Sequence, residues 1–442
     1  MVYKGLMKNM SYYVSRRRFF KAAGVMLAST ALPKWFLDEL DCSAQTNKPL
    51  SPNDRPGIAL IGCGGQGRGD CNWAKNYGDV VAVCDVDEKH LEEAANQFAR
   101  NGKKPTTYKD FRKLLEDKNV NVIINGTPDH WHTLVNLAAA KAGKDIYTEK
   151  PLTLTIDEGK RLIKAVRENK IILQVGSQQR SDPRFRLACE LVRNGRIGKI
   201  KHVTVGLPTG PREGPFKPIP VPPELNWDYY LGQAPPTEYN GHNCHWNFRW
   251  WYIFSGGQMT DWGAHHNDIA QWGLGTELSG PVEFDGKSLV DMIPGGYDAA
   301  AEFVVNCKYE NGVTMTITDG KRAPNGVKFE GTEGWIFVTR GEIKASKPEL
   351  LEEPLPSNAI RLYKSDNHMG NFFECVKSRK DPICPVEIGH RSISVAHLGV
   401  ISVRLNRPIK WDPVKEEIIG DKEANSMLVR EMRKPYDYSF IA

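Results

Sequence analysis

Residues 57–67 read Gly-Ile-Ala-Leu-Ile-Gly-Cys-Gly-Gly-Gln-Gly, a short apolar run that leads into a cluster of glycines. The apolar part, 57–61, is typical of a buried parallel strand. Gly62, Gly64 and Gly67 then fit the G-x-G-x-x-G spacing, which lets the backbone approach a pyrophosphate at the start of a helix. Because a helix-compatible stretch follows, this segment predicts the strand, turn and helix that open a dinucleotide-binding domain.

The acid that such a domain needs for the cofactor ribose is also present. A second apolar strand is predicted over 80–84, and Asp85 follows it, 23 residues after Gly62. An acid at about this spacing bonds the ribose hydroxyls. It would repel a 2′-phosphate, and Val86 beside it carries no positive charge. The sequence therefore favours NAD over NADP, with Gln66 of the glycine turn also expected against the cofactor.

Strands and helices go on alternating beyond this point. Apolar strands are predicted at 120–125, 145–148 and 171–175, with helices at 134–142 and 156–169. This alternation indicates a doubly wound parallel sheet, in which ligands bind outside the carboxyl ends of the strands. Polar residues follow two of these strand ends. Those expected at the nicotinamide end of the cofactor are Thr127, Pro128, His132, Glu149 and Lys150.

The pattern changes after residue 177, which predicts a Rossmann domain at 55–177 and a second domain at 178–442. A Pro-rich stretch, 208–236, has no regular period. We interpret it as a long ordered loop over the site or at a subunit contact. Strand-like runs between 299 and 338 alternate well enough for a largely antiparallel sheet with one face covered.

The N-terminus has the layout of an export signal. Residues 15–21 read Ser-Arg-Arg-Arg-Phe-Phe-Lys, and an apolar run of only eleven residues, 22–32, follows. That run is too short to span a bilayer, which takes about 20 residues. The paired arginines resemble a twin-arginine signal, which a receptor reads and which does not anchor the protein. We therefore assign 1–54 to signal and linker and predict a periplasmic protein without a stable membrane anchor; the alternative is a basic tail.

Charge and cysteine usage exclude other classes of protein. The net charge is +6, and seven positive charges precede the first acid, Asp38, so the rest of the chain is close to neutral. The sequence contains no basic stripe, so it does not predict a nucleic-acid partner. The nine cysteines are odd in number and form no CxxC pair, which disfavours a disulfide framework and a cysteine-based zinc site.

A second motif lies in the predicted substrate domain. Asp261 and His265 are four residues apart, after the pair Gly256-Gly257. On one helix they would share a face and touch. A carboxylate that orients an imidazole is a common acid/base arrangement.

Together these motifs resemble the Gfo/Idh/MocA oxidoreductases, named for glucose-fructose oxidoreductase and inositol dehydrogenase. The resemblance covers roughly 55–442 and implies an α/β protein: an N-terminal Rossmann domain and a C-terminal domain with an open, mostly antiparallel sheet. It implies that the second domain binds substrate and forms a dimer or tetramer. By motif match, it assigns catalysis to Lys150, Asp261 and His265 and makes the Lys150–Pro151 bond a candidate for cis geometry. We expect His265 to be the base or proton relay and Lys150 to bond the reacting hydroxyl.

Candidate substrate contacts come from aromatic and polar residues. Trp246 and Trp251 belong to a dense aromatic segment that suits the apolar faces of sugar rings, or equally a packed interdomain or dimer core. Gln178 and Arg180 follow a strand end, where they could bond hydroxyls or simply lie on a surface loop. His266 adjoins His265. The histidines of this region do not form a recognised metal-ligand spacing, so we expect no catalytic metal.

The expected function is NAD-dependent oxidation of a hydroxyl of a sugar, glycoside or polyol by hydride transfer. Export favours a tightly held cofactor, because free NAD should be scarce outside the cytoplasm. Some members of the family use NAD transiently to cleave glycosides, and this alternative uses the same residues. A non-catalytic dinucleotide sensor is disfavoured because Lys150, Asp261 and His265 are all present.

Overall fold

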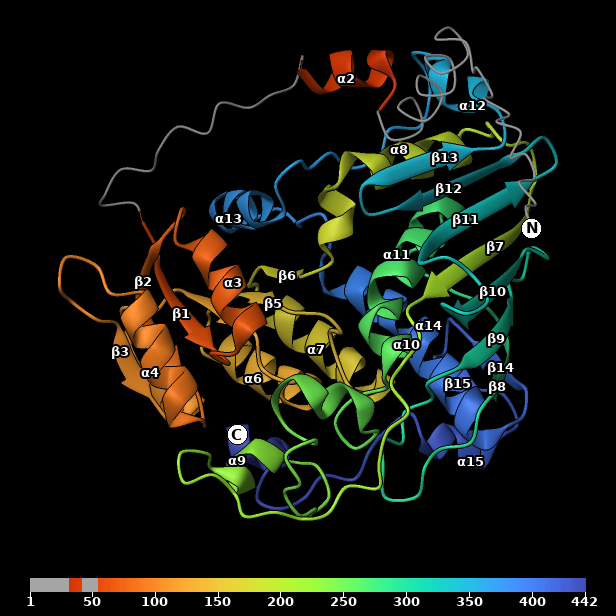
Figure 1. The fold of residues 1–442 in the computed structure, drawn as a ribbon. Helices are drawn as coiled ribbons and strands as arrows, with labels where there is room; N and C mark the ends of the chain where they lie inside the picture. The colour runs from red at the N-terminus through yellow and green to blue at the C-terminus, as the bar shows by residue number, and fades with distance from the viewer. Residues whose placement is uncertain (1–31, 42–54) are drawn as a thin grey trace, which may run out of the picture.

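The computed structural model describes residues 32–41 and 55–442, which form two α/β units side by side (Figure 1). The predicted twin-arginine segment and most of the apolar run after it lie outside the described residues. Within the described part, no helix is both long and apolar enough to span a membrane.

The first unit is a parallel sheet of six strands in the order β3-β2-β1-β4-β5-β6. This is the doubly wound arrangement that the sequence predicts. The order reverses between β1 and β4, and ligands bind in the crevice at such a point. The strands are β1 (Gly57–Ile61), β2 (Asp79–Cys84), β3 (Thr106–Tyr108), β4 (Val122–Asn125), β5 (Asp145–Thr148) and β6 (Leu173–Val175).

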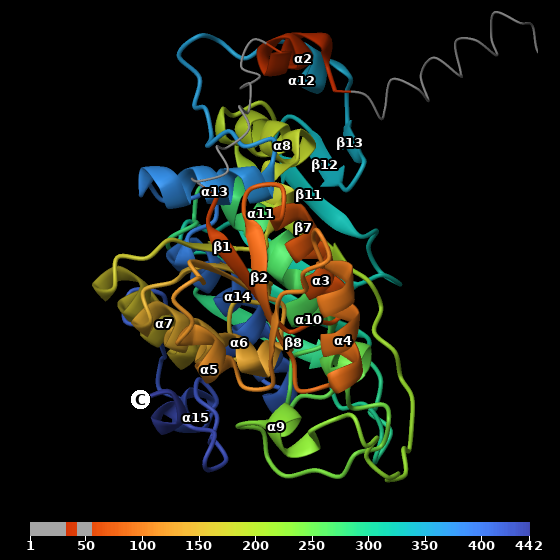
Figure 2. The same ribbon diagram turned by 90° about the vertical axis from the view of Figure 1, so that its left-hand side faces the viewer.

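Helices cover both faces of this sheet because alternate residues of each strand point to opposite sides. On β1, Ile58 and Leu60 join one hydrophobic cluster, whereas Ala59 and Ile61 join the other. Figure 2 shows the two helical layers. One holds α3 (Gly65–Ala74) and α4 (Glu88–Gln97); the other holds α5 (Phe111–Leu115), α6 (Asp129–Lys141) and α7 (Ile156–Glu168).

A helix from the far end of the chain completes the first of these layers. The helix α13 (His368–Ser378) packs on α3, and Tyr77 stacks on Phe373 with ring centroids 5.2 Å apart. Fully buried Phe372 belongs to the same cluster as β1 and α3. The Rossmann core therefore draws on residues beyond the 55–177 range that local patterning indicates.

The second unit is a sheet of nine strands in the order β13-β12-β11-β7-β10-β9-β8-β14-β15. Only β7 and β10 pair in parallel, so the mostly antiparallel sheet expected from the family resemblance is confirmed. The strands are β7 (Ile200–Leu207), β8 (Glu283–Ser288), β9 (Phe303–Lys308), β10 (Thr314–Asp319), β11 (Gly326–Gly331), β12 (Trp335–Thr339), β13 (Glu342–Ala345), β14 (Ile409–Asp412) and β15 (Glu417–Ile418).

Long helices cover one face of this sheet (Figure 1), and the last of them also packs on α7 of the Rossmann domain. They are α8 (Pro183–Arg193), α11 (Gly263–Leu274) and α14 (Val386–Leu405). The burial pattern of β9 alternates, with Phe303, Val305 and Cys307 buried and the residues between them partly or fully exposed. This is the pattern of a strand with one face covered.

The fold also includes a helix inside the range that the sequence assigns to signal and linker. The helix α2 (Lys34–Asp41) packs on the second unit. Phe36 is fully buried beneath the guanidinium of Arg186, and the indole nitrogen of Trp35 donates to the carbonyl of Leu351 at 3.0 Å. The helix α2 is therefore a departure from the assignment of residues 1–54 to signal and linker.

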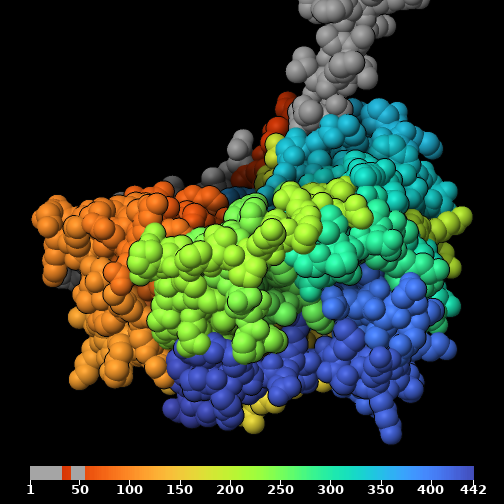
Figure 3. Space-filling view, turned by 60° about the horizontal axis from the view of Figure 1, so that its bottom comes forward, coloured from red at the N-terminus to blue at the C-terminus, as the bar shows by residue number. Residues whose placement is uncertain are grey.

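Residues 208–256, here called the insert, cross from the second sheet to the Rossmann domain. The amide of Asn226 donates to Val86 (3.0 Å), and the carbonyl of Glu224 accepts from Glu88 (2.9 Å). The insert carries the short helix α9 (Trp227–Leu231) and the 3-10 helix His245–Trp250. Figure 3 shows it in light green between the orange Rossmann domain and the rest of the second domain. It therefore lies over the cofactor side, as its interpretation as an ordered loop over the site requires.

Candidate active site

The glycine turn between β1 and α3 leaves room for a ligand. Gly62 has φ of +85°, and a Cβ on Gly67 would lie 2.1 Å from the carbonyl oxygen of Gly62, so neither position accepts a side chain. Gly64 and Gly65 are different, because a Cβ there would meet no atom within 4 Å. The first turn of α3 has no side-chain cap. Its free N–H groups are a ready anion site, and this fits a pyrophosphate.

Asp85 is held firmly at the end of β2. Its two carboxylate oxygens accept from the amides of Cys63 (2.6 Å) and Asp87 (2.9 Å). Burial raises the pKa of Asp85 above its ordinary value, although these two hydrogen bonds oppose the rise. The carboxylate keeps lone pairs for further donors, and Asp85 lines the cavity beside the glycine turn. This placement suits an acid that accepts from ribose hydroxyls.

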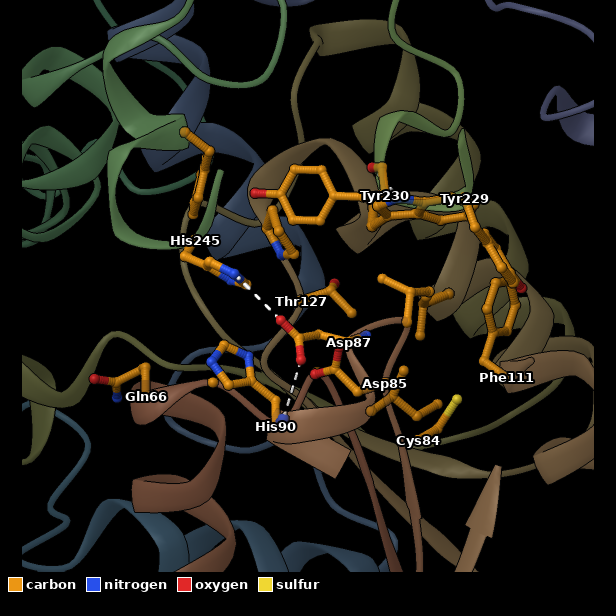
Figure 4. Close-up of a pocket in the computed structure, with 18 of the residues that line it drawn as sticks. Gln66, Cys84, Asp85, Asp87, His90, Phe111, Thr127, Tyr229, Tyr230 and His245 are labelled. Atoms are coloured by element: carbon orange, nitrogen blue, oxygen red, sulfur yellow. Dashed lines mark hydrogen bonds and ion pairs between the residues drawn. The ribbon is translucent and has the colours of Figure 1, made fainter. Parts of the chain in front are cut away.

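That cavity, the cofactor cavity, has a volume of about 530 Å³ and lies where the strand order reverses (Figure 4). One wall comes from the Rossmann domain and includes Thr127 and Pro128. The opposite wall comes from the insert. Its residues are Tyr229, Tyr230, His245, Trp246, Phe248 and Arg249. The second domain thus closes a pocket that the Rossmann domain leaves open.

Lys150 follows β5 and points to the second domain. The Lys150–Pro151 bond is cis, as the family resemblance implies. The ammonium of Lys150 donates to the carboxylate of Asp261, and Arg249 donates to the same oxygen at 3.4 Å. Burial opposes the ionisation of Asp261, but the two cations outweigh it and hold the pKa of that carboxyl below its ordinary value. The structure therefore brings Lys150 and Asp261 together as a charged pair.

The expected contact between Asp261 and His265 is wrong. The helix α10 (Gln258–Asp261) ends at Asp261, α11 begins at Gly263, and Lys150 and Arg249 bind the carboxylate. His265 is buried, and its Nδ1 has no hydrogen-bond partner among the described residues. Burial, followed by repulsion from Lys150, lowers the pKa of His265 well below its ordinary value. The imidazole is therefore neutral at pH 7 and can accept a proton.

Glu149 links the two motifs from the Rossmann side. It accepts from Gln178 at 3.0 Å and from Gln66 at 3.3 Å. Beneath it lies buried Asp70 of α3, whose pKa is raised well above its ordinary value by burial and then by the Glu149 charge. Gln66 also donates to Asp70 at 3.1 Å. Sequence reasoning missed Asp70, because a lone acid on a helix carries no signal that its side chain is buried.

Lys150, Asp261 and His265 line a second cavity of about 460 Å³, here called the Lys150 cavity. Three residues line both cavities: Gln66, Trp246 and Arg249. The two spaces therefore adjoin at the place where a nicotinamide end would meet a substrate. The other residues around the Lys150 cavity are Trp73, Glu149, Gln178, Gln179, Asp182, Trp262 and Arg340. It offers charged groups and three indole rings.

Three candidate substrate residues are placed elsewhere. Arg180, 2% exposed, pairs with Asp268 at 2.6 Å and Glu277 at 2.8 Å and lines neither cavity. His266 is fully buried and bonds Asn325 at 2.9 Å. The indole nitrogen of Trp251 donates to a backbone carbonyl of the insert. None of the three lines either cavity, so the structure places them apart from the candidate site.

His132 lies behind the loops of the cofactor cavity and does not contact the cavity directly. It is buried, and its ring nitrogens bond the carbonyls of Pro151 (2.6 Å) and Thr127 (2.8 Å). It therefore joins the two loops that carry Thr127 and Lys150 and does not line the cofactor cavity itself. Gln178 and Trp246, by contrast, line the Lys150 cavity as expected.

Arg249 is the chief residue that sequence reasoning missed. Its guanidinium bonds Asp261 and lies over the rings of Trp246 (4.4 Å) and Phe248 (4.7 Å). Arg249 lies in the aromatic segment that the sequence analysis identified. The one signal in the sequence is a cation beside several aromatic rings, and this signal does not distinguish a site residue from a surface residue.

Comparison with known proteins agrees with this geometry. The family model described as the NAD-binding Rossmann fold of an oxidoreductase family matches residues 57–177, and its C-terminal alpha/beta domain matches residues 201–438. The chain belongs to the Gfo/Idh/MocA family. It is an oxidoreductase of that family, and its cofactor is NAD.

Relatives cover nearly the whole folded part of this Gfo/Idh/MocA enzyme. Myo-inositol 2-dehydrogenase of Thermotoga maritima is 27% identical over 377 residues, which is 82% of this chain and 99% of that protein. NAD(+)-dependent scyllo-inositol 2-dehydrogenase of Bacillus subtilis is 27% identical over 346 residues, 75% of this chain and 89% of that one. The WlbA dehydrogenase of Bordetella pertussis, solved with NADH and UDP-GlcNAcA, shares the fold: TM-score 0.61, 19% identity, 81% and 99% coverage.

Proposed function

We propose that this enzyme oxidises a hydroxyl of a sugar, glycoside or polyol by hydride transfer to a tightly held NAD. One observation carries the proposal: Gln66, Trp246 and Arg249 line both the cofactor cavity and the Lys150 cavity, so substrate and nicotinamide would meet between them. The inositol dehydrogenases among the relatives support a cyclic polyol or sugar as the substrate class.

The residues divide the work by charge. NAD, when bound, supplies the hydride acceptor. Lys150 is charged and directed by Asp261, so its ammonium can donate to the reacting hydroxyl and favour the developing alkoxide. Neutral His265 is the group able to take up the hydroxyl proton. Trp246 and Trp262 offer aromatic faces for the apolar side of a sugar ring.

The insert supports the tight hold on the cofactor. Tyr229, Tyr230 and Phe248 line the cofactor cavity from the second domain, so the insert adds aromatic contacts to those of the Rossmann domain. Tight retention suits an exported enzyme, and we propose export by the twin-arginine route to the periplasm on the strength of residues 15–21. A leader fusion to a reporter that is active only after export tests this: replacing Arg16 and Arg17 by Lys should abolish export.

A homo-oligomer is proposed through the uncovered face of the nine-stranded sheet. That face carries Thr204, Asn306 and Thr316 in register on β7, β9 and β10. In a two-fold dimer the same surface patch of both subunits forms the interface, and this face offers such a patch. Light scattering on purified protein should give a dimer or tetramer, and Thr316→Arg should lower the mass toward a monomer.

The alternative is a glycoside-cleaving enzyme of the same family, in which NAD oxidises a ring hydroxyl, the aglycone is eliminated, water adds to the resulting double bond and NADH reduces the ketone again. The same Lys150 and His265 serve both reactions. The deciding experiment adds a panel of sugars, polyols and aryl glycosides to the purified enzyme with NAD. A reduced-nicotinamide absorbance band that persists with one compound supports the dehydrogenase. Aglycone release without a lasting band supports the cleaving enzyme. If no compound gives either response, both functions are contradicted.

A further inference from the structure

Two histidines and an aspartate face one another at the edge of the cofactor cavity, away from Lys150. Asp87 follows β2, His90 lies in the first turn of α4, and His245 comes from the insert (Figure 4). Their candidate ligand atoms all lie within 4.8 Å of one another, and none of the three lines the Lys150 cavity. The cluster thus joins the two domains at the edge of the cofactor cavity, apart from the Lys150 cavity.

Each member has a group available for a ligand. One carboxylate oxygen of Asp87 caps α4 by accepting from the amides of Lys89 and His90; the other faces Nε2 of His245 at 3.3 Å. The ring of His90 makes no hydrogen bond among the residues that the structure describes, and it lies 4.5 Å from the ring of His245, centroid to centroid. Two protonated imidazoles this close would repel each other. Two neutral imidazoles, by contrast, can bind the same metal cation.

His245 reaches the cluster from an uncommon backbone conformation of the insert. Its backbone has φ of +50°, a conformation that non-glycine residues seldom adopt and that aims the side chain at the Rossmann domain. Asp87, being buried, gains from a cation beside its carboxylate.

We propose that Asp87, His90 and His245 bind a divalent transition-metal ion of the zinc class, with water completing the coordination shell. Two imidazoles and a carboxylate are ligands that Zn²⁺ accepts, at about 2.0–2.2 Å. Ligand atoms in a tetrahedral shell of that size lie about 3.3 Å apart, and the Asp87–His245 pair already has this separation. The farthest atoms need to approach by about 1.5 Å, which rotation of the exposed His245 side chain can supply.

The ion would clip the insert to the Rossmann domain and leave the reaction itself unchanged. It differs from a catalytic zinc, because Lys150 and His265 lie around the other cavity. The sequence gives no hint of it, since 155 residues separate His90 from His245. Only the position of the insert brings them together.

Cobalt titration tests the proposal directly. Full-length protein carrying no histidine tag is stripped with a chelator, and Co²⁺ is added while the visible absorption of four-coordinate cobalt is followed. The expected result is a band that saturates at one ion per chain and that Zn²⁺ removes. His90→Ala and His245→Ala should each abolish it. His242→Ala, which removes an exposed histidine of the same insert outside the cluster, should leave it unchanged.

Either of two results would overturn the proposal: no cobalt band in the wild type, or a band that survives both His90→Ala and His245→Ala. Circular dichroism of each variant checks that it is folded. Metal content and thermal stabilisation by Zn²⁺ are measured in parallel, because an ion bound only to the native state raises the melting temperature by mass action. These readouts do not depend on turnover, so they stand whether or not the sugar substrate is found.

Discussion

The two adjoining cavities are lined by different kinds of chemical groups. The cofactor cavity combines bare Rossmann backbone, at Gly64 and Gly65, with aromatic side chains of the insert. The Lys150 cavity instead gathers charged groups from both domains, and its acid Asp261 is held between Lys150 and Arg249. The first is suited to hold a large ligand by shape, and the second to hold charge that changes during a reaction. Binding and chemistry should therefore be separable by mutation.

Lys150→Met should have the largest effect, because it removes the group that stabilises the reacting oxygen. We expect kcat to fall by about 10²–10⁴-fold, with NAD affinity changed by no more than about twofold. Stopped-flow absorbance measures the first, and quenching of tryptophan fluorescence by NAD measures the second. Lys164→Met, on the exposed side of α7, is the control. Parallel losses of rate and NAD affinity would show that the cavities are not separable.

Arg180→Met tests whether Arg180 lies outside the Lys150 cavity and has a structural role. The change leaves Asp268 buried without its main partner, and breaking such a pair costs about 3–5 kcal/mol of unfolding free energy. Urea unfolding measures the loss, and Arg161→Met, at a surface pair on α7, should lose less. The folded fraction should keep the wild-type KM. A raised KM with unchanged stability would restore Arg180 as a substrate contact.

Asp129 should make the stability of the protein depend on pH. It is buried at the start of α6, bonded to Ser255 of the insert, and burial raises its pKa to about 7 from an ordinary 3.8. The folded state thus holds a proton that the unfolded chain releases, so stability should fall as the pH rises from about 4 to about 7 and then level off. In Asp129→Asn this contribution should vanish. Urea unfolding at pH 5 and pH 8 should therefore show a wild-type loss that the variant lacks. Equal losses in both would refute the assignment.

Asp85→Ala should act on the other cavity alone and with the smallest effect. Hydrogen bonds to a charged group contribute about 1.5–3 kcal/mol, so NAD affinity should fall by roughly 10–100-fold while kcat at saturating NAD is retained. Asp79→Ala, at the exposed start of β2, is the matched control. An equal loss of kcat would show that Asp85 influences the chemistry as well as the binding.

Local patterning predicted the parts of the molecule that are continuous in the chain. The run 57–67 fixes its own strand, turn and helix start, and Lys150 follows a strand end as expected. Arg180 was misplaced because Asp268, its partner, lies 88 residues away, and no local pattern reports such pairing. The contact expected between Asp261 and His265 is not formed, because α10 ends at Asp261 and the carboxylate bonds Lys150 and Arg249.

Long-range packing accounts for the rest. The insert has no periodicity of its own, and so its position over the cofactor cavity, with Tyr229 and Tyr230 in the wall, depends on contacts with β2 and α4. The helix α13 joins the Rossmann core from beyond residue 360 for the same reason. In both cases the burial of aromatic side chains against a distant surface decides the outcome.

The most direct test of the central claim follows a labelled hydrogen. A compound that gives a reduced-nicotinamide signal is prepared with deuterium on the carbon that bears the reacting hydroxyl, and the NADH recovered from the enzyme is analysed by mass spectrometry. Transfer across the junction of the two cavities predicts NADH that carries the deuterium in the wild type, with the label absent from the nicotinamide in Lys150→Met over the same time. Deuterium appearing in the solvent while the recovered NADH stays unlabelled would contradict hydride transfer at this site.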